Sequence, residues 1–112
     1  MKEGDVVVLR VPQKGGLPAK LRPALVLCFL PGTCQSVLIC GISTQILQLE
    51  ANWDELIDSS DPAFAATGLH RTSAVRLSYL FAADAAEIAG TIGEVSLTVL
   101  KRLRGRLAAR LS

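Results

Sequence analysis

Three short apolar runs, each bounded by Pro or Gly, restrict the fold more than any other feature. They cover residues 6–11, 24–29 and 37–42, and they consist largely of Val, Leu and Ile. Runs of this length and composition form strands rather than helices, and Pro12 and the Pro31-Gly32 turn stop two of them. Because the runs are almost continuously apolar, both faces of each strand must be buried, as in a small closed barrel.

The rest of the chain predicts two more strands and one helix. Strand signals return at residues 73–77 and, more weakly, at 87–92. Ser96 is a suitable N-cap, and after it apolar residues recur at three- and four-residue steps through residue 111. Gly41, inside the third apolar run, predicts a bulge or a close backbone approach. The sequence therefore predicts a mainly β fold with a C-terminal helix.

Composition predicts one domain and an uneven charge. Half of the 112 residues are apolar, which is enough for a single core, so we assign residues 1–112 to one domain. The net charge is +2, but residues 96–112 hold five bases and no acid, so the remainder carries −3. A basic helix contacts nucleic acid in some proteins and is simply solvated in others. The acidic residues 50–61 predict an irregular or briefly helical surface segment around Trp53.

The cysteines and the N-terminus favour a cytoplasmic protein. Cys28, Cys34 and Cys40 are odd in number, lack a Cys-x-x-Cys spacing and lie in or beside apolar runs. They predict buried thiols in a reducing compartment rather than a zinc site or a disulfide framework, with Cys28 and Cys40 near each other if their strands pair. The charged first five residues are unlike a secretory signal, and no apolar run approaches the roughly 20 residues that a membrane span needs.

Two polar segments beside the apolar runs are candidates for chemistry. In Lys20-Leu21-Arg22-Pro23, the proline holds Arg22 extended after a Gly-rich loop, and a guanidinium in that position suits a phosphate. The alternative is a surface arginine paired with a carboxylate. In Ile42-Ser43-Thr44-Gln45, two hydroxyls and an amide end a strand and can donate to a phosphate oxygen or a base edge. Such residues also end strands in proteins where they have no further role.

Taken together, short segments in order along nearly the whole chain resemble the MazF/PemK family of toxin endoribonucleases from bacterial toxin–antitoxin pairs. The segments are Gly4-Asp5-Val6-Val7, Lys20-x-Arg22-Pro23-Ala24-Leu25-Val26-Leu27, Ile42-Ser43-Thr44-Gln45, Gly68-Leu69, Ser73-x-Val75-Arg76-Leu77 and Ile92-Gly93. The resemblance implies an SH3-like barrel with a C-terminal helix. It also implies a homodimer whose groove binds single-stranded RNA and cleaves it without a metal or other cofactor, through attack of the ribose 2′-hydroxyl on the adjacent phosphate.

The resemblance also implies roles for individual residues. Arg22 matches the catalytic arginine of the family, Ser43 matches its strand-end Thr or Ser, and Thr44 is an adjacent substitute. The expected substrate-binding residues are Lys14, Lys20, Gln45, His70 and Arg76, the last matching a second arginine of some members. A cognate antitoxin is expected to lay an acidic segment along the groove flanked by Lys14, Lys20 and Arg76.

The sequence departs from the family at the general base. Members with the second arginine carry an acid two residues later, where this chain has Ser78, and residues 12–21 contain neither a carboxylate nor a histidine. His70, the only histidine, is a candidate because imidazole exchanges protons near neutral pH. One alternative is a non-catalytic protein on the same barrel, either a gyrase binder like CcdB or a degenerate member. Another, a peptide-binding SH3-like module, would need more than five scattered aromatic residues.

Overall fold

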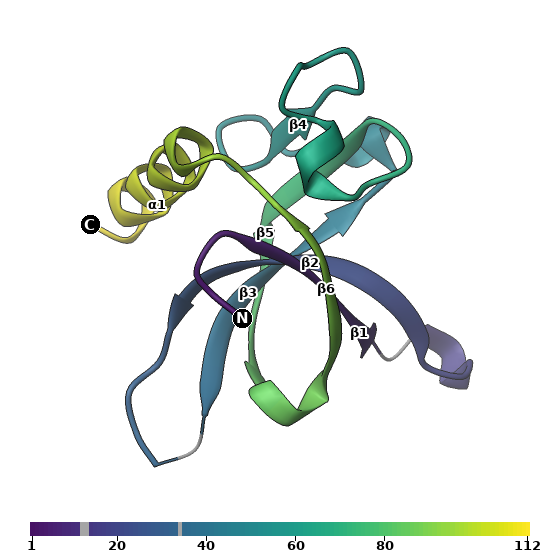
Figure 1. Ribbon diagram of the computed structural model, residues 1–112, viewed down its shortest axis with the longest axis vertical. Coiled ribbons are helices and arrows are strands. Elements are labelled where there is room, and N and C mark those ends of the chain that lie inside the picture. The colour runs from purple at the N-terminus through teal and green to yellow at the C-terminus, as the bar shows by residue number, and fades with distance from the viewer. Residues whose placement is uncertain (12–13, 34) are drawn as a thin grey trace.

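Six strands form one antiparallel sheet in the computed structural model, which describes residues 1–11, 14–33 and 35–112. The strands are β1 (Asp5–Val11), β2 (Lys20–Phe29), β3 (Ser36–Ser43), β4 (Glu55–Ile57), β5 (Ser73–Asp84) and β6 (Ile88–Glu94), and the helix is α1 (Leu97–Leu111). Short 3₁₀ turns η1 (Lys14–Gly16), η2 (Ile46–Gln48), η3 (Ala65–Thr67) and η4 (Ala85–Glu87) connect them. Figure 1 shows α1 at one side of the molecule and η1 at the opposite side.

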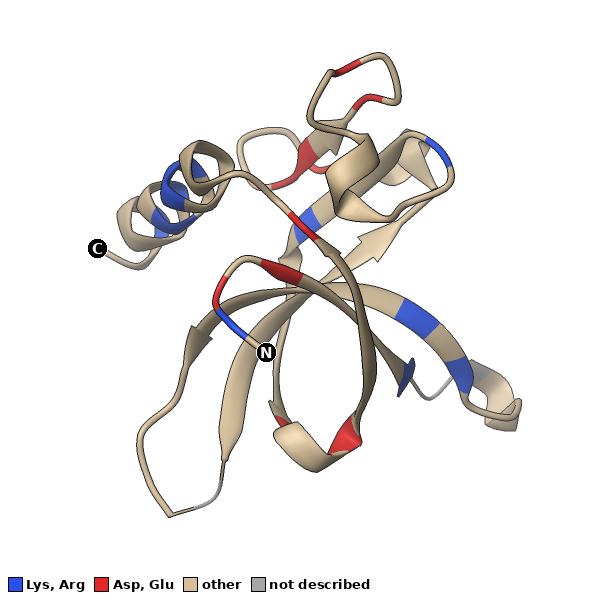
Figure 2. Ribbon diagram, in the orientation of Figure 1, with Lys and Arg blue, Asp and Glu red and all other residues tan. Residues whose placement is uncertain are grey.

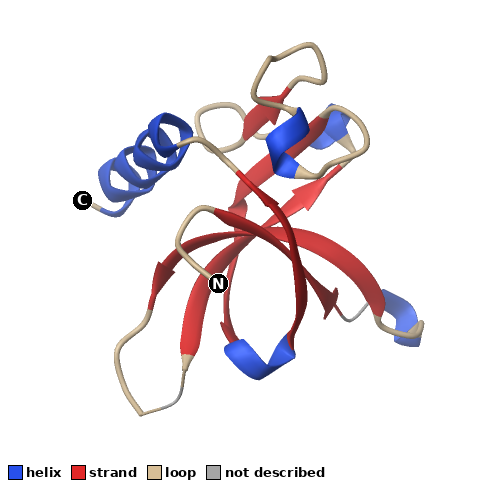
Figure 3. Cartoon of the chain, viewed as in Figure 1, coloured by secondary structure: helices blue, strands red, loops and turns tan. Residues whose placement is uncertain are grey.

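The strand order β4-β5-β3-β2-β1-β6 makes an open, strongly bent sheet rather than a closed barrel (Figure 3). The predicted fold class, mainly β with a C-terminal helix, is confirmed, whereas the expected closure is wrong: β4 and β6 are the two edges of the sheet as described. The inference that both faces are buried is nevertheless correct. Consecutive residues Val6 and Val7 belong to two separate core clusters, and each of them is 0% exposed.

The two faces are covered in different ways. On one face, Leu25, Leu27 and Leu77 pack in a cluster with Leu103 of α1 and its helical neighbours. On the other face, the bent strands β1, β2, β3 and β5 pack against one another. Burying a leucine contributes about 1.5–3 kcal/mol, so continuous apolar strands are stabilised without barrel closure.

Helix α1 has the bounds that its sequence pattern predicts. Ser96 Oγ accepts a hydrogen bond from Val99 N at 3.2 Å, which caps the first turn. Leu100, Leu103 and Leu107 are buried. Within the described residues, no helix is both long enough and apolar enough to cross a membrane.

Three arginines of α1 pair with acids of the same chain. Arg102 binds Glu55 with two hydrogen bonds of 2.8 and 2.6 Å, and Arg106 reaches the same carboxylate at 2.9 Å. Arg104 pairs with Glu3 at 2.8 Å. In Figure 2, the basic positions of α1 (blue) lie beside the acidic positions around β4 (red). The segment at residues 50–61, which was predicted to be irregular, therefore contains a strand, β4. Its Glu55 binds two arginines of α1.

We expect the Glu55→Gln variant to be less sensitive to acid than the wild type. The hydrogen bond from Arg102 lowers the pKa of Glu55 below its ordinary value of 4.5. A carboxyl whose pKa is depressed in the folded state contributes stability above its unfolded pKa, and this contribution is lost as pH falls through the folded value. Urea unfolding between about pH 5 and about pH 3 should therefore show a shallower loss of stability for Glu55→Gln. The exposed acid Glu50 provides the control, and equal slopes for Glu55→Gln and wild type would contradict the assignment.

The two cysteines that the structure describes, Cys28 and Cys40, are strand residues. Cys40 is buried, and burial raises the pKa of its thiol to about 12. The β2–β3 register places Cys28 opposite Leu38 and Cys40 opposite Leu25, so the two thiols are not cross-strand partners, and both are free. Cys34 lies outside the described residues.

Two glycines of the family-like segments, Gly68 and Gly93, lie at a close contact between η3 and β6. A Cβ on Gly93 of β6 would collide with the backbone of Ala66 and Thr67, and a Cβ on Gly68 would collide with the backbone of Ile92. Gly68 also has a φ of +73°, which side-chain-bearing residues rarely adopt. The segments Gly68-Leu69 and Ile92-Gly93 therefore hold η3 directly against β6.

Candidate functional site

A break in the β3–β5 ladder shapes the candidate site. β3 advances one residue, from Cys40 to Gly41, while its partner on β5 changes from Leu80 to Arg76. Residues 77–79 therefore lie outside the ladder, as in an enlarged β-bulge. In a regular strand, residues 76 and 79 would point to opposite faces. The break lets Arg76 and Tyr79 line the same hollow, and it agrees with the expectation of a bulge at Gly41.

This first hollow, the β5 hollow, has a volume of about 310 Å³. Its polar lining residues are Arg22 from β2, Ser43 and Gln45 from the end of β3, and Arg76 and Tyr79 from β5, with Phe81 among its apolar ones. Four of the residues predicted from the sequence thus come together: Arg22, Ser43, Gln45 and Arg76.

A second hollow, the His70 hollow, lies on the other side of Arg22 and Ser43. It has a volume of about 400 Å³ and includes Thr44, His70 and Arg71 in its lining. Because both hollows are lined by Arg22, Pro23, Ile42 and Ser43, these four residues form the ridge between them. The structure therefore places the predicted arginine and serine together, with the only histidine in the adjoining hollow.

Arg22 is an exposed cation on the ridge. It is the third residue of β2, opposite Leu9 of β1, and so lies near the start of this strand, as the sequence predicts. Pro23 precedes the first β2–β3 pair, Ala24 with Gly41, so its missing N–H does not interrupt that ladder. In the described part of the chain, the side chain of Arg22 forms no hydrogen bond or ion pair, unlike the paired surface arginine that was the alternative. Its guanidinium donors are therefore available to an anion.

Ser43 and Gln45 are linked by a local turn at the end of β3. The Gln45 backbone N–H donates to Ser43 Oγ at 3.0 Å. Since this bond uses a lone pair of the hydroxyl oxygen, the hydroxyl hydrogen remains able to donate. Ser43 can therefore donate to a phosphate oxygen held at the ridge, and the Gln45 amide lies on the β5-hollow side.

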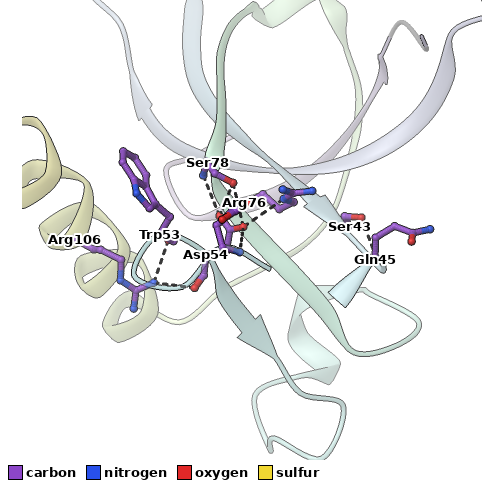
Figure 4. A network of polar contacts seen from close by, with 8 residues as sticks. Ser43, Gln45, Trp53, Asp54, Arg76, Ser78 and Arg106 are labelled. Carbon is purple, nitrogen blue, oxygen red and sulfur yellow. Dashed lines mark hydrogen bonds and ion pairs between the residues drawn. The ribbon is translucent and has the colours of Figure 1, made fainter. Parts of the chain in front are cut away.

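Arg76 is held by a buried carboxylate from the acidic segment, Asp54 (Figure 4). Asp54 Oδ2 lies 3.4 Å from Arg76 Nε, and the aspartate side chain is 0% exposed. Asp54 Oδ1 accepts hydrogen bonds from Ser78 N at 3.0 Å and Ser78 Oγ at 2.9 Å, and Oδ2 accepts one from Glu50 N at 3.0 Å. The first of these bonds satisfies a backbone N–H of the broken ladder. Asp54 therefore fixes both the bulge and the arginine beside it.

The sequence interpretation treated Asp54 as a surface acid, and this is wrong. Where members with the second arginine carry an acid, this chain has Ser78, which instead hydrogen-bonds to a carboxylate 24 residues earlier in the chain. Nothing in the local pattern reveals this contact, because the acids around Asp54 have no distinctive spacing. Arg71 and Tyr79, which line the His70 and β5 hollows respectively, were also not among the predicted residues.

Other predicted residues and hollows lie outside this arrangement. Lys20 is an exposed residue of β2 that lines neither hollow, and the side chain of Lys14 lies outside what the structure describes. A larger hollow of about 560 Å³, near Phe29 and Ile88, has no charged side chain in its lining. Within residues 1–11, 14–33 and 35–112, no cluster of three or more His, Cys, Asp or Glu has the arrangement of a metal site. The ridge and its two hollows are therefore the candidate site.

Comparisons with known proteins support the family resemblance. A family model described as PemK-like, MazF-like toxin of type II toxin–antitoxin system matches residues 2–111. Among solved structures, the Mycobacterium tuberculosis toxin MazF-mt6 is similar, with a TM-score of 0.66 and 15% identity over 96% of this chain and 95% of that one. A search of curated proteins gives no match. The chain belongs to the family of PemK-like, MazF-like toxins of type II toxin–antitoxin systems, a family known for endoribonucleases.

Proposed function

We propose that this protein is an endoribonuclease toxin that cleaves single-stranded RNA at the ridge formed by Arg22 and Ser43. The supporting observation is the state of Arg22, an exposed guanidinium without a partner in the described chain, beside a strand-end hydroxyl and between two hollows. A fixed cation next to a donor hydroxyl is suited to a phosphate that gains negative charge during the reaction.

In the proposed reaction, the ribose 2′-oxygen forms a bond to the adjacent phosphorus and the 5′-oxygen of the next nucleotide leaves. A proton leaves the 2′-hydroxyl and another reaches the departing 5′-oxygen. Arg22 and the Ser43 hydroxyl contact the non-bridging oxygens, and Thr44 offers a second hydroxyl at the same strand end. His70, which lines the hollow on the other side of the ridge, is our candidate for one of these proton transfers.

The buried Asp54 is not proposed as the general base. Its side chain is 0% exposed and already accepts hydrogen bonds from Ser78 and Glu50. It acts instead through Arg76, whose side chain remains 23% exposed in the β5 hollow. Arg22 and Arg76 therefore both supply positive charge to the β5 hollow. We expect activity to persist in EDTA.

A panel of fluorogenic single-stranded RNAs, incubated with the protein in EDTA, tests this function. We expect cleavage of a subset of sequences, with products that end at one type of junction. If the wild type cleaves no RNA of the panel, a non-catalytic binding protein on the same fold replaces the proposal.

We also propose a homodimer that binds an acidic antitoxin segment. Several large apolar side chains are exposed in the described chain, among them Leu47 at 99% and Leu17 at 61%. Exposed apolar surface of this kind is typical of association sites. Sedimentation at micromolar concentration should give the mass of two chains, and a monomer alone would contradict the dimer.

A further inference from the structure

Tyr79 is placed in the β5 hollow as an oriented, half-exposed aromatic ring. Its exposure is 49%, which is high for a large aromatic side chain. A Cβ built on Gly41 would lie 3.4 Å from Tyr79 Cδ1, so the ring lies over the glycine of the neighbouring strand. The Phe81 ring is roughly perpendicular to it, with centroids 5.4 Å apart and an interplanar angle of 87°. The ring is thus supported by the sheet at Gly41 and by Phe81.

The surroundings of this ring suit a nucleotide. Arg22 and Arg76, together with Ser43, line the same hollow as Tyr79. Single-stranded nucleic acids bind where cations contact the backbone and aromatic faces stack on bases. The Gln45 amide, also in the lining, is able to hydrogen-bond to a base edge. The hollow therefore presents partners for a phosphate, a base plane and a base edge.

We propose that Tyr79, braced by Phe81 over Gly41, stacks on the base of the nucleotide beside the phosphate that Arg22 contacts. This inference rests on the proposed function and assigns the β5 hollow to one flanking nucleotide. The His70 hollow, whose lining contains no Phe, Tyr or Trp, takes the nucleotide on the other side of the ridge. RNA is thus held asymmetrically, with a tyrosine ring on one side of the scissile bond only.

The test uses an RNA whose cleavage site has been mapped and two matched RNAs with an abasic residue on either side of the cleaved bond. We expect wild type to lose about 10- to 100-fold in kcat/KM on one of the two abasic RNAs and far less on the other. Tyr79→Ala should lose a similar factor on intact RNA and show no further loss on that abasic RNA. Tyr79→Phe, which keeps the ring, should remain near wild type.

Phe29→Ala is the matched control, since Phe29 is 51% exposed but lines the separate 560 Å³ hollow. It should cleave all three RNAs as wild type does. If wild type and Tyr79→Ala suffer the same abasic penalty, the stacking subsite is wrong while the proposed function stands. If wild type cleaves nothing, the function fails, and fluorescence anisotropy decides the subsite, with one short single-stranded RNA and its variants that are abasic at each position in turn. An abasic penalty in binding that Tyr79→Ala abolishes supports the subsite, and any other pattern overturns it.

Discussion

Arg22→Ala should lower the rate of RNA cleavage by about 10²–10³-fold, by analogy with removal of a donor that stabilises an oxyanion. Arg22 is exposed on the ridge, and no carboxylate of the described chain pairs with it. Its full charge is therefore available to the phosphate, whose negative charge grows in the transition state. An interaction that strengthens in the transition state affects the rate more than the binding of RNA. Cleavage of a fluorogenic RNA and anisotropy with the same RNA measure the two effects separately.

Arg10→Ala is a matched control for this prediction. Arg10 is exposed on β1, lies one register position from the Leu9–Arg22 pair and lines neither hollow. The Arg10→Ala variant loses the same charge as Arg22→Ala and should cleave RNA at nearly the wild-type rate.

Ser43→Ala should lower the rate of cleavage, as Arg22→Ala does, but less severely, because Thr44 offers a neighbouring hydroxyl. Equal rates for wild type and Arg22→Ala would show that the reaction takes place elsewhere.

Asp54→Ala should lower the free energy of unfolding by about 3–5 kcal/mol, the usual effect of removing one partner from a buried ion pair. The substitution leaves Arg76 Nε, which is buried and has no hydrogen-bond partner in the described chain, without its nearest charge. It also removes the acceptor of Ser78 N and Ser78 Oγ. Urea unfolding monitored by circular dichroism measures the loss.

Asp54 is expected both to stabilise the fold and to position Arg76, and further variants separate these effects. Glu50→Ala removes an exposed acid from the same segment and should change stability by less than about 0.5 kcal/mol. In an Asp54→Asn background, Ser78→Asp returns a carboxylate close to where Asp54 lies, since Ser78 Oγ is 2.9 Å from Asp54 Oδ1. We expect Asp54→Asn to reduce kcat and the added Ser78→Asp to restore part of it. A stable Asp54→Ala protein, or kcat unaffected by Asp54→Asn, would contradict this account.

The sequence predicts the parts of this structure that depend on local chemistry. Apolar residues spaced three and four apart, together with the N-cap Ser96, predict where α1 begins and ends. The runs rich in β-branched residues predict the central strands. The resemblance to the MazF/PemK family implied that Arg22 and Ser43 act together. The structure places them side by side because β2 and β3 pair from Ala24 and Gly41 onward.

The features that the sequence did not predict depend on contacts between distant segments. β4 is only three residues long, and it pairs with β5 at Ser73–Val75. Tyr79 reaches the face of Arg76 because the ladder breaks after Cys40, and a regular alternation would have placed it on the opposite face. The closed barrel was inferred from burial on both faces, but α1 covers one of these faces instead.

The central claim is that the 2′-hydroxyl of RNA attacks a phosphate held at Arg22, and one substrate pair tests it most directly. The pair is a single-stranded RNA with a mapped cleavage site and the same RNA with one 2′-deoxy residue at the attacking position. In EDTA, the wild-type protein should cleave the first, leaving a 2′,3′-cyclic phosphate and a 5′-hydroxyl end, and should leave the second intact. Cleavage of both substrates at equal rates, or of neither, would contradict the proposed reaction.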